Sequence, residues 1–379
     1  YKDSDGNGLY ELYIGGIGEI NAPVNSFYLF GGFDNMTFLI FNGLLNTKNV
    51  TNMSYMFYGC SLLTQLDLSS FDTSSVTKMG GMFEADEKLI SLDLSSFVTK
   101  NVTEMYFMFS RCYQLKNINF DKFDTSNVVN MGYMFQNCSS LVGLNLSSFN
   151  TFNTEKMQYM FYGCSSLNTL DLSNFNTSSV TNMLCLFTNC SSIKTLDLTN
   201  FNTSNVTNMS GMFWNCSSLT NLDLSNFNTS HATSMQSMFQ NCAKLTKIDL
   251  RNFDTSNVIT MQGMFYECYS LTTLNLSSFN TSKVTNMKMM FDDCNKLANL
   301  DLSNFNTNKV SNMNALFRNC RLLEKLDISS FDFSSVTTSS DMFGNVPINS
   351  LIYVKDDASK KFILSIRNDL SNIQIKEIN

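Results

Sequence analysis

Residues 206–230 read V-T-N-M-S-G-M-F-W-N-C-S-S-L-T-N-L-D-L-S-N-F-N-T-S, and most of the chain is built from copies of this pattern. Its Met-Phe pair, which is Leu-Phe in two copies, recurs with an interval of 26 residues. The phenylalanines of these pairs are Phe57, Phe83, Phe109, Phe135, Phe161, Phe187, Phe213, Phe239, Phe265, Phe291, Phe317 and Phe343. Twelve copies without an insertion predict a repeat solenoid, and this period is typical of leucine-rich repeats.

Each repeat contains two periodicities. Leu222 and Leu224 alternate with the polar Asp223, which predicts a short strand with one buried face. Apolar residues in 206–219 recur every three or four positions, which is typical of a helix. We therefore expect each repeat to consist of a short strand, a polar corner and a short helix.

Stacking these repeats predicts the overall architecture. Parallel strands of successive repeats lie about 4.8 Å apart, whereas a helix is about 10 Å across. The helical side is therefore expected to spread, which would place the strands on the concave face. The predicted fold is an α/β leucine-rich-repeat solenoid of about twelve 26-residue repeats, with a parallel β-sheet on the concave face and short helices on the convex side.

The sequence divides into an array and two ends. The array covers residues 50–346. Residues 1–49 are interpreted as an N-terminal cap with a degenerate first repeat, in which Leu29 and Phe30 stand near the Met-Phe position. Residues 347–379 are interpreted as a C-terminal cap with a strand at 351–354, a helix at 359–370 and a final apolar run at 373–378. Caps are needed because a last repeat left open exposes apolar surface and strand edges.

Composition excludes two classes of partner. Net charge is −7, and the 25 Lys and Arg residues form no basic run, so we expect no nucleic-acid binding. No apolar run approaches the roughly 20 residues of a membrane helix, so we expect no membrane insertion within this chain. The 43% of hydrophobic residues is enough for a packed interior.

Cysteine follows the repeat as closely as phenylalanine does. Ten of the 11 cysteines share one register: Cys60, Cys112, Cys138, Cys164, Cys190, Cys216, Cys242, Cys268, Cys294 and Cys320. Stacked side chains point the same way, and an unbroken run of nine cannot pair completely, so we expect buried thiols rather than disulfides. A collinear column cannot surround a zinc ion tetrahedrally either. Cys185 lies outside the register and is expected to be the most reactive thiol.

The string Phe-x-x-Cys-x-x-Leu-x-x-Leu-x-Leu, present as Phe213, Cys216, Leu219, Leu222 and Leu224, resembles the repeat of the BspA-like leucine-rich-repeat bacterial surface proteins. The resemblance covers about residues 50–346. It implies a secreted or surface-attached bacterial protein of the adhesin type. Its partner would be a protein or glycan of a host or neighbouring cell.

The central residue of Leu-Asp-Leu forms a polar ladder on the strand face. Its candidate binding members are Asp171, Asp197, Asp223 and Asp249. Carboxylates at strand spacing repel one another, so hydrogen-bonding neighbours, protonation or bound cations must compensate. A uniform ladder lacks the two distinct environments that paired catalytic carboxylates need. A solvated, hydrogen-bonded ladder is therefore the simpler interpretation.

A weak calcium motif lies at the N-terminal end. Asp3, Asp5 and Asn7 alternate in Asp-Ser-Asp-Gly-Asn-Gly as oxygen ligands do at the start of a calcium loop. Ile14 occupies the position at which an EF-hand supplies its bidentate Glu. A plain Asp-Gly or Asn-Gly turn is the alternative.

Binding candidates were found by comparing the repeats with one another. The residues next to Met-Phe vary most and include surface-type aromatics, of which Tyr58, Tyr159, Tyr162, Trp214 and Tyr266 are the candidates for contact with a partner. Tyr and Trp are enriched in binding hot spots. The alternative is that exposed positions simply vary.

Catalysis has little support in the sequence. The only histidine is His231, in a corner position held elsewhere by Ser or Asn, and no catalytic triad or phosphate loop accompanies it. We therefore expect a non-enzymatic extracellular scaffold without a cofactor, used for binding or adhesion. The alternative function is a passive spacer in the cell envelope.

Overall fold

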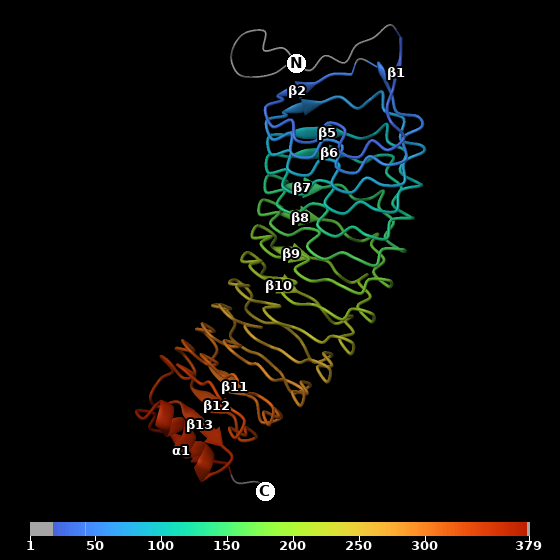
Figure 1. The fold of residues 1–379 in the computed structure, drawn as a ribbon. Coiled ribbons are helices and arrows are strands. Elements are labelled where there is room, and N and C mark those ends of the chain that lie inside the picture. Colours follow the sequence, from blue (N-terminus) through green and yellow to red (C-terminus); the bar gives the residue numbers. More distant parts are fainter. Residues whose placement is uncertain (1–17, 42, 377–379) are drawn as a thin grey trace. The chain divides into compact units, whose positions relative to one another are not determined.

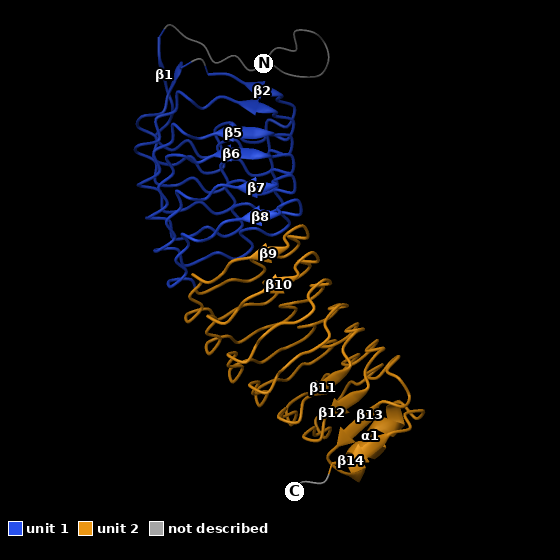
Figure 2. Ribbon diagram, turned by 180° about the vertical axis from the view of Figure 1, so that it is seen from behind, with its two compact units in different colours: residues 1–180 blue, residues 181–379 orange. Residues whose placement is uncertain are grey.

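A computed structural model describes residues 18–41 and 43–376. The chain forms two compact units, residues 1–180 and residues 181–379, called unit 1 and unit 2 below (Figure 2). In the sequence, the 26-residue spacing continues unchanged across this boundary. Within each unit, consecutive repeats lie one after another in chain order (Figure 1).

Unit 1 contains eight short strands in its described part. They are β1 Ile20–Asn21, β2 Phe38–Leu39, β3 Leu45–Asn46, β4 Gln65–Leu66, β5 Ser91–Asp93, β6 Asn117–Asn119, β7 Gly143–Leu144 and β8 Thr169–Leu170. All of them pair in parallel, as β1 with β3, β2 with β4, β5 with β6 and β7 with β8. The sheet that the repeat predicts is therefore present as short pairs.

Unit 2 contains six strands and one helix in its described part. They are β9 Thr195–Leu196, β10 Asn221–Leu222, β11 Asn299–Asp301, β12 Lys325–Asp327, β13 Leu351–Val354, α1 Asp357–Ile366 and β14 Ile373–Ile375. β9 pairs with β10, and β11, β12, β13 and β14 form a four-stranded parallel sheet. Between β10 and β11, residues 247–249 and 273–275 lie at the same register but are not assigned to strands.

The strand part of the repeat agrees with the sequence prediction. Leu222 and Leu224 are buried, whereas Asp223 between them is exposed. Pairing joins equivalent residues of successive repeats, as with Leu300 and Leu326 in β11 and β12. The structure is therefore a parallel β-solenoid of 26-residue repeats.

The short helices expected at 206–219 and its equivalents are wrong. In the flank segment, defined as residues 209–216 and their equivalents, every second N–H donates to a carbonyl of the next repeat. Of the intervening N–H groups, those of Met212, Trp214 and Cys216 donate to the carbonyl three residues back and close tight turns. The Ser210 N–H donates to Asn208 Oδ1 instead. The inter-repeat distances are 2.8 Å for Gly211 to Gln236, 3.0 Å for Phe213 to Met238 and 2.7 Å for Asn215 to Gln240. Among the described residues, the only helix is α1.

Two left-handed residues per repeat make these tight turns possible. In 209–216 they are Gly211, with φ of 61°, and Asn215, with φ of 59°. The first left-handed position is held by Tyr28, Tyr55, Gly81, Phe107, Tyr133, Tyr159, Cys185, Gly211, Ser237, Gly263, Met289, Ala315 and Asp341. The physical reason is width: a helix about 10 Å across cannot repeat at the strand spacing, whereas a chain of tight turns can.

Ring spacing differs between the two phenylalanine columns. Stacked rings of the Met-Phe column lie 5.5–5.9 Å apart, as in Phe109–Phe135 and Phe187–Phe213. Rings of the second column, which follows the strand, lie 6.3–6.5 Å apart, as in Phe123–Phe149 and Phe305–Phe331. Flank hydrogen bonds continue from repeat to repeat within each unit, whereas strand pairing is interrupted. The phenylalanines that follow the strand are thus spaced more widely than those of the Met-Phe column, and the concave position of the strand face stays a prediction.

Columns of identical side chains fill the interior, as the repeat predicts. The Phe and Met columns are almost completely buried, and neighbouring Phe rings stack nearly parallel, for example at 4° for Phe57 and Phe83. Phe30 continues the Met-Phe column, stacking on Phe57 at 5.6 Å. The degenerate N-terminal repeat therefore packs in the same register as the regular ones.

A buried threonine column adds hydrogen bonds between neighbouring repeats outside the strands. The Thr255 hydroxyl donates to the Asn280 carbonyl oxygen at 2.9 Å and accepts the Asn280 N–H at 2.8 Å. Equivalent pairs occur at Thr125 and Asn150. One hydroxyl thus forms hydrogen bonds with both the N–H and the carbonyl oxygen of a residue in the next repeat, at a point where no strand is present.

The cysteine column is buried, as predicted, and its thiols donate hydrogen bonds to main-chain carbonyl oxygens of the preceding repeat. The thiol of Cys112 donates to the Phe83 carbonyl oxygen at 3.0 Å, and Cys164 does the same to Phe135 at 3.1 Å. Burial raises the pKa of Cys164 to about 12, which disfavours the reactive thiolate. Cys185 is buried as well, but it is 7% exposed whereas the column cysteines are 0% exposed, and its greater reactivity stays a prediction.

Asp86 interrupts the cysteine column. Its side chain is fully buried, and one carboxyl oxygen accepts the Cys60 N–H at 2.8 Å. The second oxygen has no hydrogen-bond partner among the described residues. Burial raises the pKa of Asp86 well above its ordinary value. Burial thus favours the protonated form of this side chain in the folded chain.

The C-terminal end is covered by regular structure. β13 coincides with the strand expected at 351–354, while α1 begins and ends earlier than the predicted 359–370 helix. β14 pairs with the outer side of β13, and Phe362 of α1 stacks on Phe333 at 4.4 Å. The last repeat is thus not left open.

The threonine column predicts a specific loss of stability. Thr255→Val keeps the shape of the side chain but leaves the Asn280 N–H and carbonyl without their buried partner. We expect the free energy of unfolding to fall by about 1–3 kcal/mol, measured by chemical denaturation. Thr246→Val, at an exposed site, should change it by less than about 0.5 kcal/mol. Equal effects of the two changes would contradict the assigned role of the column.

Asp86 predicts a pH-dependent difference in stability. Its folded-state pKa is raised above the unfolded value, so the folded chain binds more protons between these two values. The stability that the protonated acid contributes is present at low pH and is lost as pH rises through the folded pKa. Asp86→Cys restores the column, so its advantage over the parent should increase from pH 4 to pH 8. At pH 8 we expect about 1–3 kcal/mol, measured by denaturation at each pH.

Comparing the two proteins at each pH isolates this residue, because the other titrating groups are common to both. An advantage that stayed constant or decreased as pH rose would show that Asp86 is not held protonated by its surroundings.

Candidate functional site

Aromatic side chains gather on the flank of unit 1. They form what we call the aromatic strip: Phe27, Tyr28, Tyr55, Tyr58, Tyr106, Phe107, Tyr133, Tyr159 and Tyr162. Phe27 is 52% exposed and Tyr28 is 43% exposed, while the other seven are half-buried. Three of the five residues predicted to contact a partner, Tyr58, Tyr159 and Tyr162, belong to this one strip.

Ring contacts connect the strip from end to end. In its middle the rings stack face to face, at 4.3 Å between Phe107 and Tyr133 and 4.7 Å between Tyr133 and Tyr159. At its N-terminal end the rings meet at steeper angles, as with Tyr55 and Tyr58 at 67°. The strip therefore has face-to-face stacked rings in its middle and steeply angled rings at its N-terminal end.

Five rings of the strip belong to residues in the left-handed conformation. Tyr28, Tyr55, Phe107, Tyr133 and Tyr159 occupy the first left-handed position, with φ between 57° and 63°. This conformation costs a bulky residue about 1–2 kcal/mol, whereas Gly adopts it freely. Unit 2 has no aromatic residue at this position. Unit 1 thus retains unfavourable residues at the positions that form the strip, as binding sites often do.

Glycine provides the space that the strip needs in one repeat. A Cβ atom at Gly81 would lie 2.3 Å from the Tyr55 ring, and one at Gly80 would lie 2.7 Å from the Tyr106 ring. The two tyrosines therefore lean over the glycines from either side and meet with ring centroids 6.4 Å apart. A side chain at either glycine would separate them.

The two remaining predicted contact residues lie in unit 2, apart from any such strip. Trp214 is 39% exposed and Tyr266 is half-buried. Neither makes a ring contact with another aromatic side chain in the described part of the chain. Burial, followed by a hydrogen bond with Glu267, raises the pKa of Tyr266 to about 12. The five residues predicted to contact a partner therefore divide into three that belong to one continuous surface and two that lie apart from it.

The aspartate ladder has a structural role on the strand face. Asp171, Asp197, Asp223 and Asp249 are exposed, and each carboxylate accepts the N–H of the residue two positions later, at 2.9–3.1 Å. These Asx turns end the strands. The hydrogen bond from Ser225 lowers the pKa of Asp223, and Arg251 lowers that of Asp249 to about 2. Hydrogen bonds to the ionised form thus offset the repulsion within the ladder.

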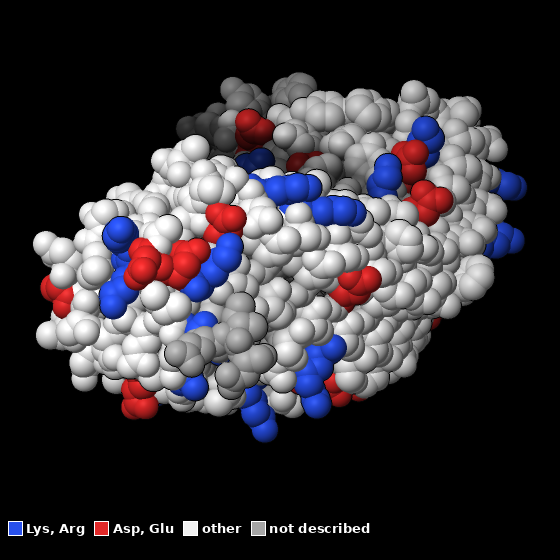
Figure 3. All heavy atoms as spheres, turned by 90° about the horizontal axis from the view of Figure 1, so that it is seen from below, with Lys and Arg blue, Asp and Glu red and all other residues white. Residues whose placement is uncertain are grey.

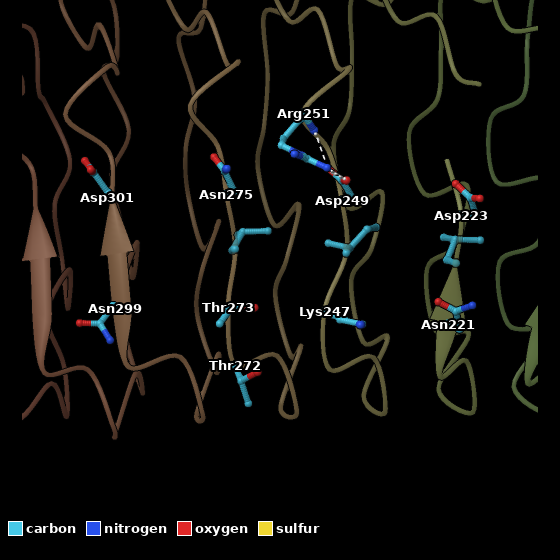
Figure 4. Close-up of a pocket in the computed structure, with 13 residues that line it drawn as sticks. Asn221, Asp223, Lys247, Asp249, Arg251, Thr272, Thr273, Asn275, Asn299 and Asp301 are labelled. Carbon is cyan, nitrogen blue, oxygen red and sulfur yellow. Dashed lines mark hydrogen bonds and ion pairs between the residues drawn. The ribbon is translucent and has the colours of Figure 1, made fainter. Parts of the chain in front are cut away.

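Part of this ladder borders a hollow in unit 2. Its volume is about 770 Å³, and it lies where residues 247–249 and 273–275 are not paired as strands. Figure 4 shows two rows of polar side chains along its edges, with Asn221, Lys247, Thr273 and Asn299 in one row and Asp223, Asp249, Asn275 and Asp301 in the other. Leu222, Ile248 and Leu274 form its apolar floor. Arg251 already pairs with Asp249 at 2.6 Å.

Charged residues form no continuous patch on the face shown in Figure 3. Lys, Arg, Asp and Glu lie there singly or in small groups, separated by uncharged surface. In residues 18–41 and 43–376, no three His, Cys, Asp or Glu side chains are grouped so that they could hold a metal ion. The weak calcium candidates Asp3, Asp5 and Asn7 lie outside the described residues.

None of the helices in the described part of the chain has the length and apolarity that crossing a membrane requires.

Comparison with known families assigns the array. Residues 28–352 match, in overlapping segments, the family described as Mycoplasma protein of unknown function, DUF285. The chain belongs to this family. The description of this family states no activity, so membership of the family indicates the repeat but assigns no function. No curated protein matches the sequence.

Solved structures with a similar backbone include two bacterial repeat proteins. One is a leucine-rich cell surface protein from Faecalibacterium prausnitzii, with 16% identity, 98% of this chain and 86% of that chain covered, and a TM-score of 0.37. The other is a leucine-rich repeat protein from Eubacterium ventriosum, with 15% identity, 76% and 83% covered, and a TM-score of 0.39.

Several members of the strip are not among the five residues predicted to contact a partner. Phe27 and Tyr28 lie in the degenerate first repeat, where an interval of 27 residues separates Phe30 from Phe57 and hides the register. Tyr55, Tyr106, Phe107 and Tyr133 stand at variable positions next to Met-Phe, but a helical interpretation gave no reason to place them beside one another. The signal was present in the sequence as a concentration of aromatics before residue 163.

Proposed function

We propose that this chain is a non-enzymatic scaffold on the outside of a bacterial cell, which binds a macromolecule of a host or neighbouring cell through the aromatic strip. The observation that carries the proposal is the continuous contact of nine partly exposed rings from Phe27 to Tyr162. Tyr and other aromatics contribute much of the energy at binding hot spots. The extracellular location is supported by the resemblance of the repeat to surface proteins.

Stacking in the strip favours a protein as the partner. A sugar ring packs on an open aromatic face, but Tyr133 has Phe107 on one side and Tyr159 on the other. Ring edges and half-buried apolar surface remain available there, and they suit the side chains of a protein partner. A glycan would have to use the N-terminal end of the strip.

The spacer function rests on a different observation. Phe, Met, Thr and Cys columns repeat with little change, and the aspartate ladder is engaged in its own Asx turns. Such regularity is sufficient for a rigid spacer, but it does not account for aromatic residues held at left-handed positions in unit 1 alone.

A double substitution separates binding from folding. Tyr133→Asn with Tyr159→Asn removes the middle of the strip, and Asn tolerates the left-handed conformation that tyrosine does not favour. The variant is therefore expected to fold. Binding to immobilised collagen, laminin and mucin and to a glycan array, measured by surface plasmon resonance, should fall by at least about tenfold for whichever probe the parent binds.

Met289→Asn is the matched control, because Met289 occupies the same left-handed position in unit 2. It should leave binding unchanged. Undiminished binding by a folded Tyr133/Tyr159 variant would exclude the strip, and a folded parent that binds none of the probes would favour the spacer.

A further inference from the structure

The N-terminal end of the strip encloses a hollow of about 550 Å³. It is lined by Phe27, Tyr28, Tyr55, Tyr58, Phe107 and a single charged residue, Glu84. Five aromatic side chains and one carboxylate are an unusual combination for a surface depression. It differs from the strand-face hollow of unit 2, which is bordered by amides, hydroxyls and charges of both signs.

Four of the rings form a closed circuit around this site. Centroids lie 6.4 Å apart for Phe27 and Tyr28, 5.8 Å for Tyr28 and Tyr58, 5.8 Å for Tyr58 and Tyr55, and 5.6 Å for Tyr55 and Phe27. Two corners of the circuit are close to edge-to-face, at 67° and 66°. Rings that meet at such corners turn their faces in different directions, as the walls of an aromatic cage do.

Glu84 supplies a negative charge without a matching cation. It is half-buried and forms no salt bridge with the described residues, while the neighbouring Arg111 pairs with Glu87 at 3.8 Å. Burial raises the pKa of Glu84, and the more distant charge of Arg111 only partly opposes this effect. A cation in the hollow would provide the missing charge.

The chemistry of the lining distinguishes between cations. A lysine ammonium is strongly hydrated and has three N–H donors, for which one carboxylate and the tyrosine hydroxyls offer few acceptors. A quaternary ammonium has no donors and carries its charge behind apolar methyl groups. Aromatic faces attract such ions through their quadrupoles, and aromatic cages are a common means of recognising them.

We propose that the hollow lined by Phe27, Tyr28, Tyr55, Tyr58, Glu84 and Phe107 binds a quaternary ammonium group, such as the trimethylammonium of choline. The ring faces stabilise its positive charge, and the Glu84 carboxylate lies at the side of the cation. This site deepens the proposed function, since it rests on the strip being a binding surface and names the chemistry recognised at one end of it.

Choline and its neutral isostere 3,3-dimethylbutan-1-ol test the site, because the two differ in charge but hardly in shape. We expect the complete chain to bind choline about tenfold more tightly than the neutral alcohol, measured by isothermal titration calorimetry. Glu84→Gln should weaken choline binding by about fivefold to tenfold and leave the alcohol unaffected. Tyr58→Leu, which keeps apolar bulk but removes a ring face, should weaken choline as well.

Asp121→Asn is the matched control, since Asp121 carries the same charge in unit 1, is exposed and lies outside the hollow. It should bind choline as the parent does. Equal affinities for choline and the alcohol, or undiminished choline binding by Glu84→Gln, would overturn the proposal, and so would tighter binding of N-acetyl-lysine methylamide than of choline.

This result is separate from the test of the strip as a whole. If choline fails to bind while the Tyr133/Tyr159 variant still loses its macromolecular partner, only the cage is excluded. If choline binds as expected while that variant keeps its partner, the cage stands and the wider strip does not.

Discussion

The structure depends on one constraint, which is that every segment of a repeat must fit into the thickness of one strand. Flank segments meet this constraint by sending alternate N–H groups to the next repeat and closing the others into tight turns, as at Gly211, Met212 and Phe213. Two of the three tight turns in a flank segment, 209–212 and 213–216, have a left-handed residue at their third position, Gly211 and Asn215. The threonine column serves the same purpose where strands are absent, because one hydroxyl holds both main-chain groups of the neighbouring repeat.

This constraint links the fold to the candidate site. Main-chain hydrogen bonds to both neighbouring repeats hold the left-handed positions, so the residues there can vary without loss of the fold. Unit 2 has Cys, Gly, Ser, Met, Ala and Asp at the first of these positions, whereas unit 1 has mainly Tyr and Phe. A backbone that repeats without change can thus carry a binding surface over part of its length and a surface without a binding role over the rest.

Much of the fold could be predicted from the sequence, because a position that is buried in every repeat has a similar apolar side chain in every repeat. Period, strand alternation at Leu222 and Leu224, and the buried Phe, Met and Cys columns all follow from side-chain chemistry. The helix prediction at 206–219 failed because a spacing of three or four residues places side chains on one side of a helix and equally on one side of a series of tight turns. The aromatic strip could not be predicted as one surface for the same reason. Tyr58, Tyr159 and Tyr162 could be predicted singly, but which rings lie beside them depends on left-handed φ values, and the sequence does not show these.

Far-UV circular dichroism of the purified chain tests the central claim most directly. The claim is that the flank segments are tight turns that contain left-handed residues. In the described part of the chain, helix is then confined to the ten residues of α1. The account predicts a spectrum dominated by β-structure and turns, without the double minimum of α-helix. A strong helical double minimum would show that the flanks are helical, and would contradict both the assigned fold and the aromatic strip that depends on it.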